Sequence, residues 1–532
     1  LEPGDYSVKV VGEGRPGSDF VDFTVAAGET TAVRVESTPP GRIFVRIVDD
    51  RGVALPAKAT ALGTYGPEYA TALTPEFLFD LEAGEEFLST DLVDDDPDDP
   101  DTLGYIEAVA FTADGTAELR VRPGDYQVVS SRGPEYDTAS SRVSVRSGET
   151  VTVGHRLKRV VDTRGWLAMD SHVHSKQSID SGMALDERVV ALAAEGVEVP
   201  VATDHNFITD YAPYVAGNGL ERWMHPIVGI EMTTLESGHF NGYPLEYRVG
   251  DITKGSFDWA RRPPDDIFAD LRDLGSLSPE ETVIQVNHPR DDLLGYFTQY
   301  TRDPLTAEQQ PADFLDRFIS PTGPAFLDEA GNTRFSFEFD AIELLNGKLF
   351  WEIRHYRVPE ILPPGNLPPA EVIPPAGSLL IEEGGDVAFP GVVDDWFNLL
   401  NKGHRFVGLG TGDSHTGFDE AGQFRTMVYT GVDEPLAVDD RTVMEAIRSR
   451  RVVATNGPLV DFWVNDPVAG VMGRTLVDGD GEVSLTWRLT SAPWISVGRV
   501  NVYRNGQIAS STEIDEDRDL AADRPGIAAL LA

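Results

Sequence analysis

An internal repeat with an offset of 120 residues constrains the fold of this chain most strongly. "PGDYSVKV" begins at Pro3 and "PGDYQVVS" begins at Pro123, and a Gly-Glu-Thr turn follows each copy, with its glycine at Gly28 and Gly148. Around these markers apolar and polar residues alternate with period two, which is typical of antiparallel strands joined by glycine turns. The repeat predicts a complete β-sandwich over residues 42–158. It also predicts that residues 1–38 are the last strands of an earlier, truncated copy.

The pattern changes near residue 165, where short apolar runs begin to alternate with helical patterns. "SGMALDERVVALAAEG" predicts a capped helix. The runs that predict buried strands are "VEVPVATDH", "PIVGIEMTT", "TVIQVNHPR", "FDAIELLNG" and "RFVGLGTGDSH". This alternation over residues 165–456 indicates an α/β barrel-like domain, with an insertion-rich, partly proline-rich region at 292–400. Period-two alternation returns after residue 457 and predicts an incomplete C-terminal β-domain over 457–532.

Composition excludes several classes of function. A net charge of −44 repels nucleic-acid phosphates and favours divalent cations. The absence of cysteine excludes disulfides, thiolate metal ligands and a cysteine nucleophile. No apolar run is long enough to span a membrane. We therefore expect a small-molecule partner, no nucleic acid and no transmembrane segment; the oligomeric state is left open.

Histidines and acids gather where the predicted strands end. In an α/β barrel the carboxyl ends of the strands open onto one face, so these side chains should converge. Imidazole with carboxylate suits Zn²⁺, Mn²⁺ or Fe²⁺ better than Ca²⁺ or Mg²⁺, so we expect two or three divalent ions. The candidate ligands are His172, His174, Asp180, His205, Glu231, His239, His288, Asp413 and His415. The four other histidines are predicted to be structural: His155, His225, His355 and His404.

The order HxH, TDH, strand-borne Glu, two spaced His and DxH resembles the PHP (polymerase and histidinol phosphatase) superfamily of metallohydrolases. "EGVEVPVATDHN", "NHPR", "IELLNG", "GDSH" and "TNGP" are similar to its CehA/McbA-like branch, which includes a carbaryl-hydrolysing esterase. The resemblance covers about residues 42–510. It implies a multidomain protein: a distorted (β/α)7 barrel of the PHP/TIM-like type, flanked by immunoglobulin-like or carboxypeptidase-regulatory-like β-sandwich domains.

The resemblance also implies how the ligands are shared. The first ion would be held by His172, His174, Glu231 and Asp413. The second would be held by Glu231, His239 and His288. A third cluster would contain Asp180, His205 and His415. Asp180 stands one residue further from the HxH pair than in the small phosphoesterases of the superfamily, and it could instead cap the following helix near Met183.

The predicted chemistry is attack of a metal-bound hydroxide on a phosphoester or on a carboxylic or carbamic ester. The catalytic candidates beside the ligands are Asp180, His205, Asp204 and Arg425. Asp204 is either a ligand or a group that orients His205 or moves a proton. Arg425, or its rival Arg290, would clamp an anionic substrate, or either could form a structural ion pair. Glu343 and Asn346 are candidates for substrate contacts, for contacts to the ligands, or for scaffold residues.

Two alternatives compete with this hypothesis. An amidohydrolase barrel also begins with HxH, but it usually ends in a lone Asp and often uses a carbamylated Lys, so the DxH ending disfavours it. A non-catalytic extracytoplasmic binding protein on a PHP-like scaffold would explain the β-domains but not the full ligand set. The flanking β-domains favour an extracytoplasmic location of bacterial type: periplasmic, cell-surface or secreted.

Overall fold

The protein divides into two compact units, the first consisting mainly of Leu1–Val160 and the second mainly of Val161–Ser491. The computed structural model describes residues 1–10, 18–65, 92–94, 103–291, 294–304, 306–308, 327–348, 380–381, 387–388, 391–416, 421–464, 472–477, 479 and 484–514. The expected proline-rich loop, the C-terminal tail and His355 lie outside these residues. Among the described helices, none has the length and apolar character needed to cross a membrane.

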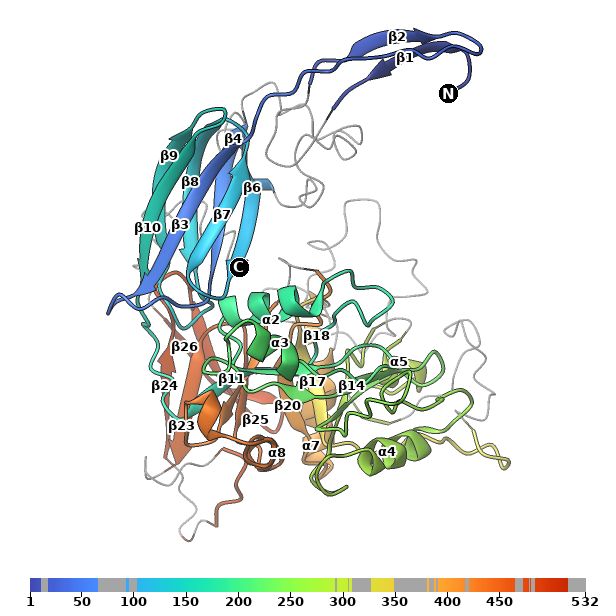
Figure 1. The fold of residues 1–532 in the computed structure, drawn as a ribbon. Helices are drawn as coiled ribbons and strands as arrows, with labels where there is room; N and C mark the ends of the chain where they lie inside the picture. Colours follow the sequence, from blue (N-terminus) through green and yellow to red (C-terminus); the bar gives the residue numbers. More distant parts are fainter. Residues whose placement is uncertain are drawn as a thin grey trace. The chain divides into compact units, whose positions relative to one another are not determined.

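The first unit is built from strands (Figure 1). Its strands among the described residues are β1 (Gly4–Val8), β2 (Val21–Val25), β3 (Gly41–Asp49), β4 (Ala57–Tyr65), β5 (Leu92–Asp94), β6 (Leu103–Thr112), β7 (Thr116–Val121), β8 (Gly124–Ser131), β9 (Ala139–Val145) and β10 (Thr150–Leu157). A three-stranded sheet has the order β10-β3-β7, and a five-stranded antiparallel sheet has the order β5-β6-β4-β8-β9. In β3 the alternate residues Ile43, Val45 and Ile47 are fully buried, as expected for a strand with one face on a core.

The two copies of the repeat share one strand register. β1 pairs with β2 so that Gly4 lies opposite Val25, and β8 pairs with β9 so that Gly124 lies opposite Val145. In each copy the tyrosine after the "PGD" turn donates its hydroxyl hydrogen to a carbonyl four residues earlier, at 2.7 Å. The sequence repeat is therefore also a structural repeat, while the boundaries 1–38, 42–158, 165–456 and 457–532 stay predictions.

Two five-stranded sheets form the second unit. The first has the order β13-β12-β11-β21-β22, and the second has the order β14-β15-β16-β17-β20. These strands are β11 (Trp166–Asp170), β12 (Val199–Ala202), β13 (Ile227–Val228), β14 (Ile230–Thr233), β15 (His239–Tyr243), β16 (Val283–Val286), β17 (Ala341–Asn346), β20 (Val407–Thr411), β21 (Arg425–Tyr429) and β22 (Val452–Thr455). All five runs predicted as buried strands contain at least one of these strands, and β12, β15 and β16 are buried along their whole length.

Neither sheet is purely parallel, which differs from a regular β/α barrel. β21 runs antiparallel to β11, and β15 runs antiparallel to both β14 and β16. The sheets nevertheless share one apolar core, because Leu167 and Val201 of the first sheet belong to the same buried cluster as Val283 and Leu409 of the second. Isolated bridges, His205 to Glu231 and Val173 to Ser414, also link strand ends of the two sheets.

Helices and smaller hairpins complete the second unit. The helices are α2 (Leu185–Ala194), α3 (Ala212–Gly217), α4 (Pro264–Asp273), α5 (Tyr296–Gln299), α7 (Val392–Asn401), η6 (Pro435–Ala437) and α8 (Asp440–Arg448). The remaining strands pair as β18 (Leu380–Ile381) with β19 (Val387–Ala388), β23 (Leu459–Val464) with β24 (Leu485–Thr490), and β25 (Arg499–Arg504) with β26 (Gln507–Glu513). The helix predicted after the HxH pair is α2, which has acids in its first turn and ends near Gly196 at φ +75°.

Candidate metal centre

The HxH and DxH segments lie side by side. β11 ends at Asp170, and the chain continues beside the residues that follow β20. The backbone N–H of Asp413 donates to the carbonyl of His172 at 2.7 Å, and the N–H of His174 donates to the carbonyl of Ser414 at 3.0 Å. This pairing brings the imidazoles of one segment against the carboxylate and imidazole of the other.

The other candidate ligands reach the same edge from neighbouring strands. His205 follows β12 and forms a bridge with Glu231 of β14. His239 is the first residue of β15 and lies opposite Thr233, the last residue of β14. Because β15 is antiparallel to β14, its start and not its end meets the site. His288 follows β16 by two residues.

All nine candidate ligands belong to groups whose ligand atoms lie within 4.8 Å of one another. The four groups found among the described residues are His172/His174/Glu231, His172/His288/Asp413, His205/Glu231/His239 and His174/Asp180/His205/His415. They differ in detail from the sharing implied by the resemblance. His288 groups with His172 and Asp413 and not with His239, and His174 joins the Asp180 group.

Glu231 is the centre of the arrangement. Its carboxylate is fully buried and faces five imidazoles. The N···O distances are 3.2 Å to His172, 3.8 Å to His174, 2.5 Å to His205, 3.2 Å to His239 and 3.6 Å to His288. One carboxylate thus connects two of the groups, which is the arrangement that a bridging ligand requires.

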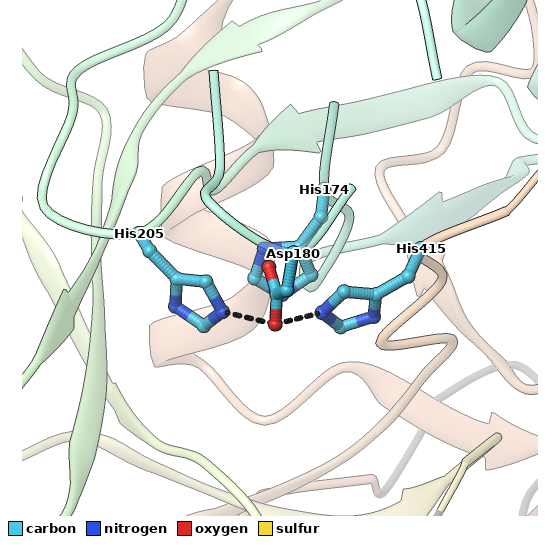
Figure 2. A group of neighbouring side chains, drawn as sticks. All are labelled: His174, Asp180, His205 and His415. Atoms are coloured by element: carbon cyan, nitrogen blue, oxygen red, sulfur yellow. Dashed lines mark hydrogen bonds and ion pairs between the residues drawn. The ribbon is translucent and has the colours of Figure 1, made fainter. Parts of the chain in front are cut away.

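Asp180 lies between two imidazoles of the group His174/Asp180/His205/His415 (Figure 2). Its Oδ2 is 3.2 Å from Nε2 of His205 and 3.2 Å from Nε2 of His415. The alternative reading as a helix cap is wrong, because α2 begins after Ala184 and that end has no side-chain cap hydrogen bond. Asp180 is also the most exposed of the nine side chains, at 47%.

Burial and charge act against each other in this cluster. Burial lowers the pKa of His174 to about 3, so this imidazole is neutral and available as a ligand. Burial also opposes a charge on His205, but the carboxylates of Glu231 and Asp180 raise the pKa of His205 to about 10. Burial would raise the pKa of Glu231, yet the surrounding imidazoles, His205 first, hold it well below its usual range. The site's own charges therefore favour the ionised carboxylate that cation binding needs.

The donor set fits a divalent ion. Two ligand atoms on one ion at about 2.1 Å are about 3.0–3.4 Å apart in octahedral or tetrahedral geometry. Nε2 of His172 is 3.3 Å from Oδ1 of Asp413, and Nε2 of His174 is 3.1 Å from the same oxygen. In addition, Nε2 of His239 is buried and has no hydrogen-bond partner among the described residues. A cation would satisfy that nitrogen.

Glu343 and Asn346 of β17 support the ligands from outside. Glu343 Oε1 is 2.9 Å from Nδ1 of His172, which leaves Nε2 of that ring for the centre. Glu343 also accepts from the backbone N–H of His288, and Asn346 Nδ2 donates to Glu343 at 3.0 Å and to Asp413 at 3.3 Å. A carboxylate on the far nitrogen of a ligating histidine fixes its tautomer and orientation. These contacts favour a role for Glu343 and Asn346 in positioning the metal ligands over a role as scaffold residues.

Two of the candidate ligands have unusual backbone conformations. His288 has φ 23° and Asp413 has φ 51°, and neither residue is glycine. Positive φ in such residues is uncommon and occurs frequently at functional sites. The conformation of Asp413 is held by its N–H bond to the carbonyl of His172. The strain therefore accompanies the placement of ligand side chains.

The structure does not place Asp204 against the His205 ring. Its oxygens accept from the backbone and hydroxyl of Ser175, at 2.6 and 2.7 Å, from Ser178 Oγ at 2.9 Å and from Thr209 Oγ1 at 2.6 Å. Ser178 Oγ is in turn 2.9 Å from Nδ1 of His174. Asp204 thus organises the loop after the HxH pair, and these contacts do not support the expected orienting contact with His205.

The two candidate substrate arginines are engaged elsewhere. Arg425 is 1% exposed, and its guanidinium donates to the carbonyls of Gly422 and Glu195. Arg290 forms a two-pronged pair with the buried carboxylate of Asp395, at 2.5 and 2.6 Å. Both guanidinium groups therefore have structural partners, which favours the structural alternative over an anion clamp.

The remaining described histidines lie outside the four groups. His155 in β10 contacts Ser130 and Ser141, His225 pairs with Asp440, and His404 stacks on Phe337 with ring centroids 4.3 Å apart.

Asn287 is a site residue that sequence reasoning missed. Its Nδ2 donates to Oε1 of Glu231 at 2.8 Å and to Oδ1 of Asn241 at 2.8 Å. Its position immediately before His288 in "VNHPR" is the signal that could have found it. Thr233 was missed as well, although its Oγ1 is 2.5 Å from Nδ1 of His205.

No family model matches the chain, and no curated protein matches it. A solved two-domain protein from Bacteroides vulgatus, whose name includes a predicted PHP-like metal-dependent phosphoesterase, is 19% identical with a TM-score of 0.31, covering 56% of this chain and 67% of its own. A streptococcal ancillary pilin is 13% identical with a TM-score of 0.16, covering 33% and 50%. A minor pilin of Streptococcus agalactiae is 16% identical with a TM-score of 0.14, covering 27% and 60%. The site is therefore interpreted from its own geometry.

Proposed function

We propose that the chain is a metal-dependent hydrolase of ester bonds, acting on phosphoesters or on carboxylic or carbamic esters. The observation that carries this proposal is the carboxylate of Glu231, which is buried among five imidazoles and belongs to two of the four metal-competent groups. A cluster of this kind is costly to bury unless its charges serve a ligand.

We also propose that the second unit is a distorted seven-stranded barrel of the PHP type. The pairings that support this run from β11 to β12, β14, β15, β16, β17 and β20. The bridge between Val173 and Ser414 would close the ring from β20 back to β11. The order of the ligands along the chain supports membership of the PHP superfamily, and the CehA/McbA-like branch stays a finer proposal based on the sequence resemblance.

Two or three ions of Zn²⁺, Mn²⁺ or Fe²⁺ would be held by the nine candidate ligands. When bound, such ions lower the pKa of water and polarise the oxygen of the attacked ester. The chain contributes the fixed positions of the ligands, because seven of the nine side chains are at most 9% exposed. Preorganised donors of this kind need no rearrangement during the reaction.

Substrate would approach from the side of Asp180 and His205. Their side chains are 47% and 15% exposed and are the most accessible of the nine. The contact of 3.2 Å between Oδ2 of Asp180 and Nε2 of His205 can hold a proton beside an incoming ester or its leaving group. This placement supports catalytic roles for these two residues and not for Arg425 or Arg290.

A substrate panel tests the proposed function. Phosphomonoesters, phosphodiesters and aryl esters are offered to the purified chain with Mn²⁺ or with Zn²⁺. We expect turnover of at least one ester class, loss of turnover on chelation and recovery when the ion is restored. A chain that binds its ions but hydrolyses no member of the panel would favour a non-catalytic binding protein. The extracytoplasmic location stays a prediction, supported by the two β-rich repeat copies that precede this unit.

A further inference from the structure

We propose that Arg188 is a positioning residue that holds the HxH and DxH segments at the separation needed to share metal ions. The inference rests on the proposed function and assigns a role to a residue that is not itself a member of any of the four ligand groups. Arg188 lies on α2 and is fully buried.

Its guanidinium reaches both ligand-bearing segments. Nε donates to the carbonyl of His174 at 2.8 Å. Nη1 donates to Oγ of Ser414 at 2.7 Å, and Nη2 donates to the carbonyl of Ser414 at 3.3 Å. One planar guanidinium therefore connects His174, which supplies an imidazole, with Ser414, which lies between Asp413 and His415.

The acceptors explain why arginine occupies this position. The three bonds use donors from the planar guanidinium, whose geometry is fixed. A lysine ammonium at the same place is a point charge on a flexible stem and cannot keep the same directed fork. A buried guanidinium is expensive to desolvate, and its directed bonds to the carbonyls of His174 and Ser414 and to the Ser414 hydroxyl offset part of that cost.

The placement predicts which groups depend on Arg188. His172/His288/Asp413 and His174/Asp180/His205/His415 combine ligands from both segments. The group His205/Glu231/His239 uses neither segment. Weakening the hydrogen bonds of Arg188 should therefore lower the affinity for ions in the first two groups. It should leave the affinity for an ion in the last group unchanged.

The test compares Arg188→Lys with a matched control. Arg272 lies on α4, and its guanidinium also donates to backbone carbonyls, those of Thr282, Glu338 and Pro279 at 2.7, 2.9 and 3.4 Å, and in addition to the carboxylate of Asp340 at 3.1 Å. These acceptors precede β16 and β17 and carry no candidate ligand, so Arg272→Lys makes the same chemical change away from the centre. Ser414→Ala is a milder second variant that removes only the hydroxyl acceptor.

Calorimetric titration with Mn²⁺ and with Zn²⁺ gives the readout, on full-length chains whose circular dichroism and cooperative unfolding match the wild type. We expect Arg188→Lys to bind at least one ion about ten- to hundredfold more weakly, the range for loss of an outer contact to metal ligands, while another ion keeps its affinity. Ser414→Ala should weaken the same ion by less, and Arg272→Lys should match the wild type.

The inference would be overturned if Arg188→Lys bound every ion with wild-type affinity. If Arg188→Lys does not fold, the same result in Ser414→Ala would overturn it. Equal weakening of all ions, or an equal effect of Arg272→Lys, would also overturn it by showing a general loss of stability. A wild-type chain that binds no ion would instead defeat the proposed function on which the inference depends.

Discussion

Replacing Asp180 by asparagine separates a role in the metal centre from a role in folding. Asparagine keeps the size of the side chain and one oxygen acceptor but removes the charge. The carboxylate stands 3.2 Å from Nε2 of both His205 and His415, so the change removes the only anionic member of the group His174/Asp180/His205/His415. The groups built around Glu231 and Asp413 keep all their members.

The expected magnitude follows from this geometry. One of four donors loses its charge while three imidazoles remain, so we expect the affinity of an ion in this group to fall about ten- to hundredfold, or about 1.4–2.7 kcal/mol. We expect kcat to fall at least about tenfold on any ester that the wild type hydrolyses. Because Asp180 does not cap α2, the substitution removes no helix cap, and any change in the free energy of unfolding without metal comes from its ion pairs with His205 and His415.

Titration calorimetry with Mn²⁺ and Zn²⁺ measures the affinities, and urea unfolding measures stability. Asp186→Asn is the control, because Asp186 is an exposed acid in the first turn of α2 and belongs to none of the groups. Unchanged ion number, affinity and kcat in Asp180→Asn would refute the reasoning and leave Asp180 outside the centre.

Three further predictions concern two candidate ligands of the first ion, the bridging carboxylate of Glu231, and a buried histidine outside the metal centre. His172→Ala and Asp413→Ala should each abolish hydrolysis at saturating metal while the chain still unfolds cooperatively; near-wild-type turnover in either variant would contradict their place among the ligands. Glu231→Gln should lower the number of ions bound, since Glu231 belongs to two groups, and elemental analysis of the dialysed variant checks this against the wild type. Burial lowers the pKa of His155, so as the pH falls the unfolded chain takes up a proton before the folded chain does. Its contribution to stability should be constant above about pH 6.5 and decline below it. The gap between urea midpoints of wild type and His155→Gln should therefore be smaller at pH 5.5 than at pH 7.5, and a gap that widens would contradict the sign.

The candidate ligands could be predicted because each lies at or near the end of a short buried strand. Strand ends are visible as an apolar run followed by polar residues, and convergence then follows from topology. His239 is the instructive exception, because it begins the antiparallel strand β15, whose sequence "HFNGY" contains residues that strands usually avoid. The sequence identifies His239 as a candidate ligand but does not predict that a strand begins there.

Side-chain partners could not be predicted in the same way. The sequence leaves open whether Arg425 and Arg290 bind an anion or form structural pairs. In the structure their partners are the carbonyls of Glu195 and Gly422 and the carboxylate of Asp395. Arg188 had no sequence signal, since its acceptors are distant in the chain and depend on the packing of α2. Tertiary contacts of this kind are set by neighbours that no local pattern identifies.

The number of divalent ions per chain tests the central claim most directly. The purified chain is loaded with Mn²⁺ or Zn²⁺, dialysed, and measured by elemental analysis alongside its protein concentration. We expect two or more ions per chain, because nine candidate ligands fall into four overlapping groups, two of which contain Glu231. Less than one transition-metal ion per chain, with no uptake when Mn²⁺ or Zn²⁺ is added, would contradict it.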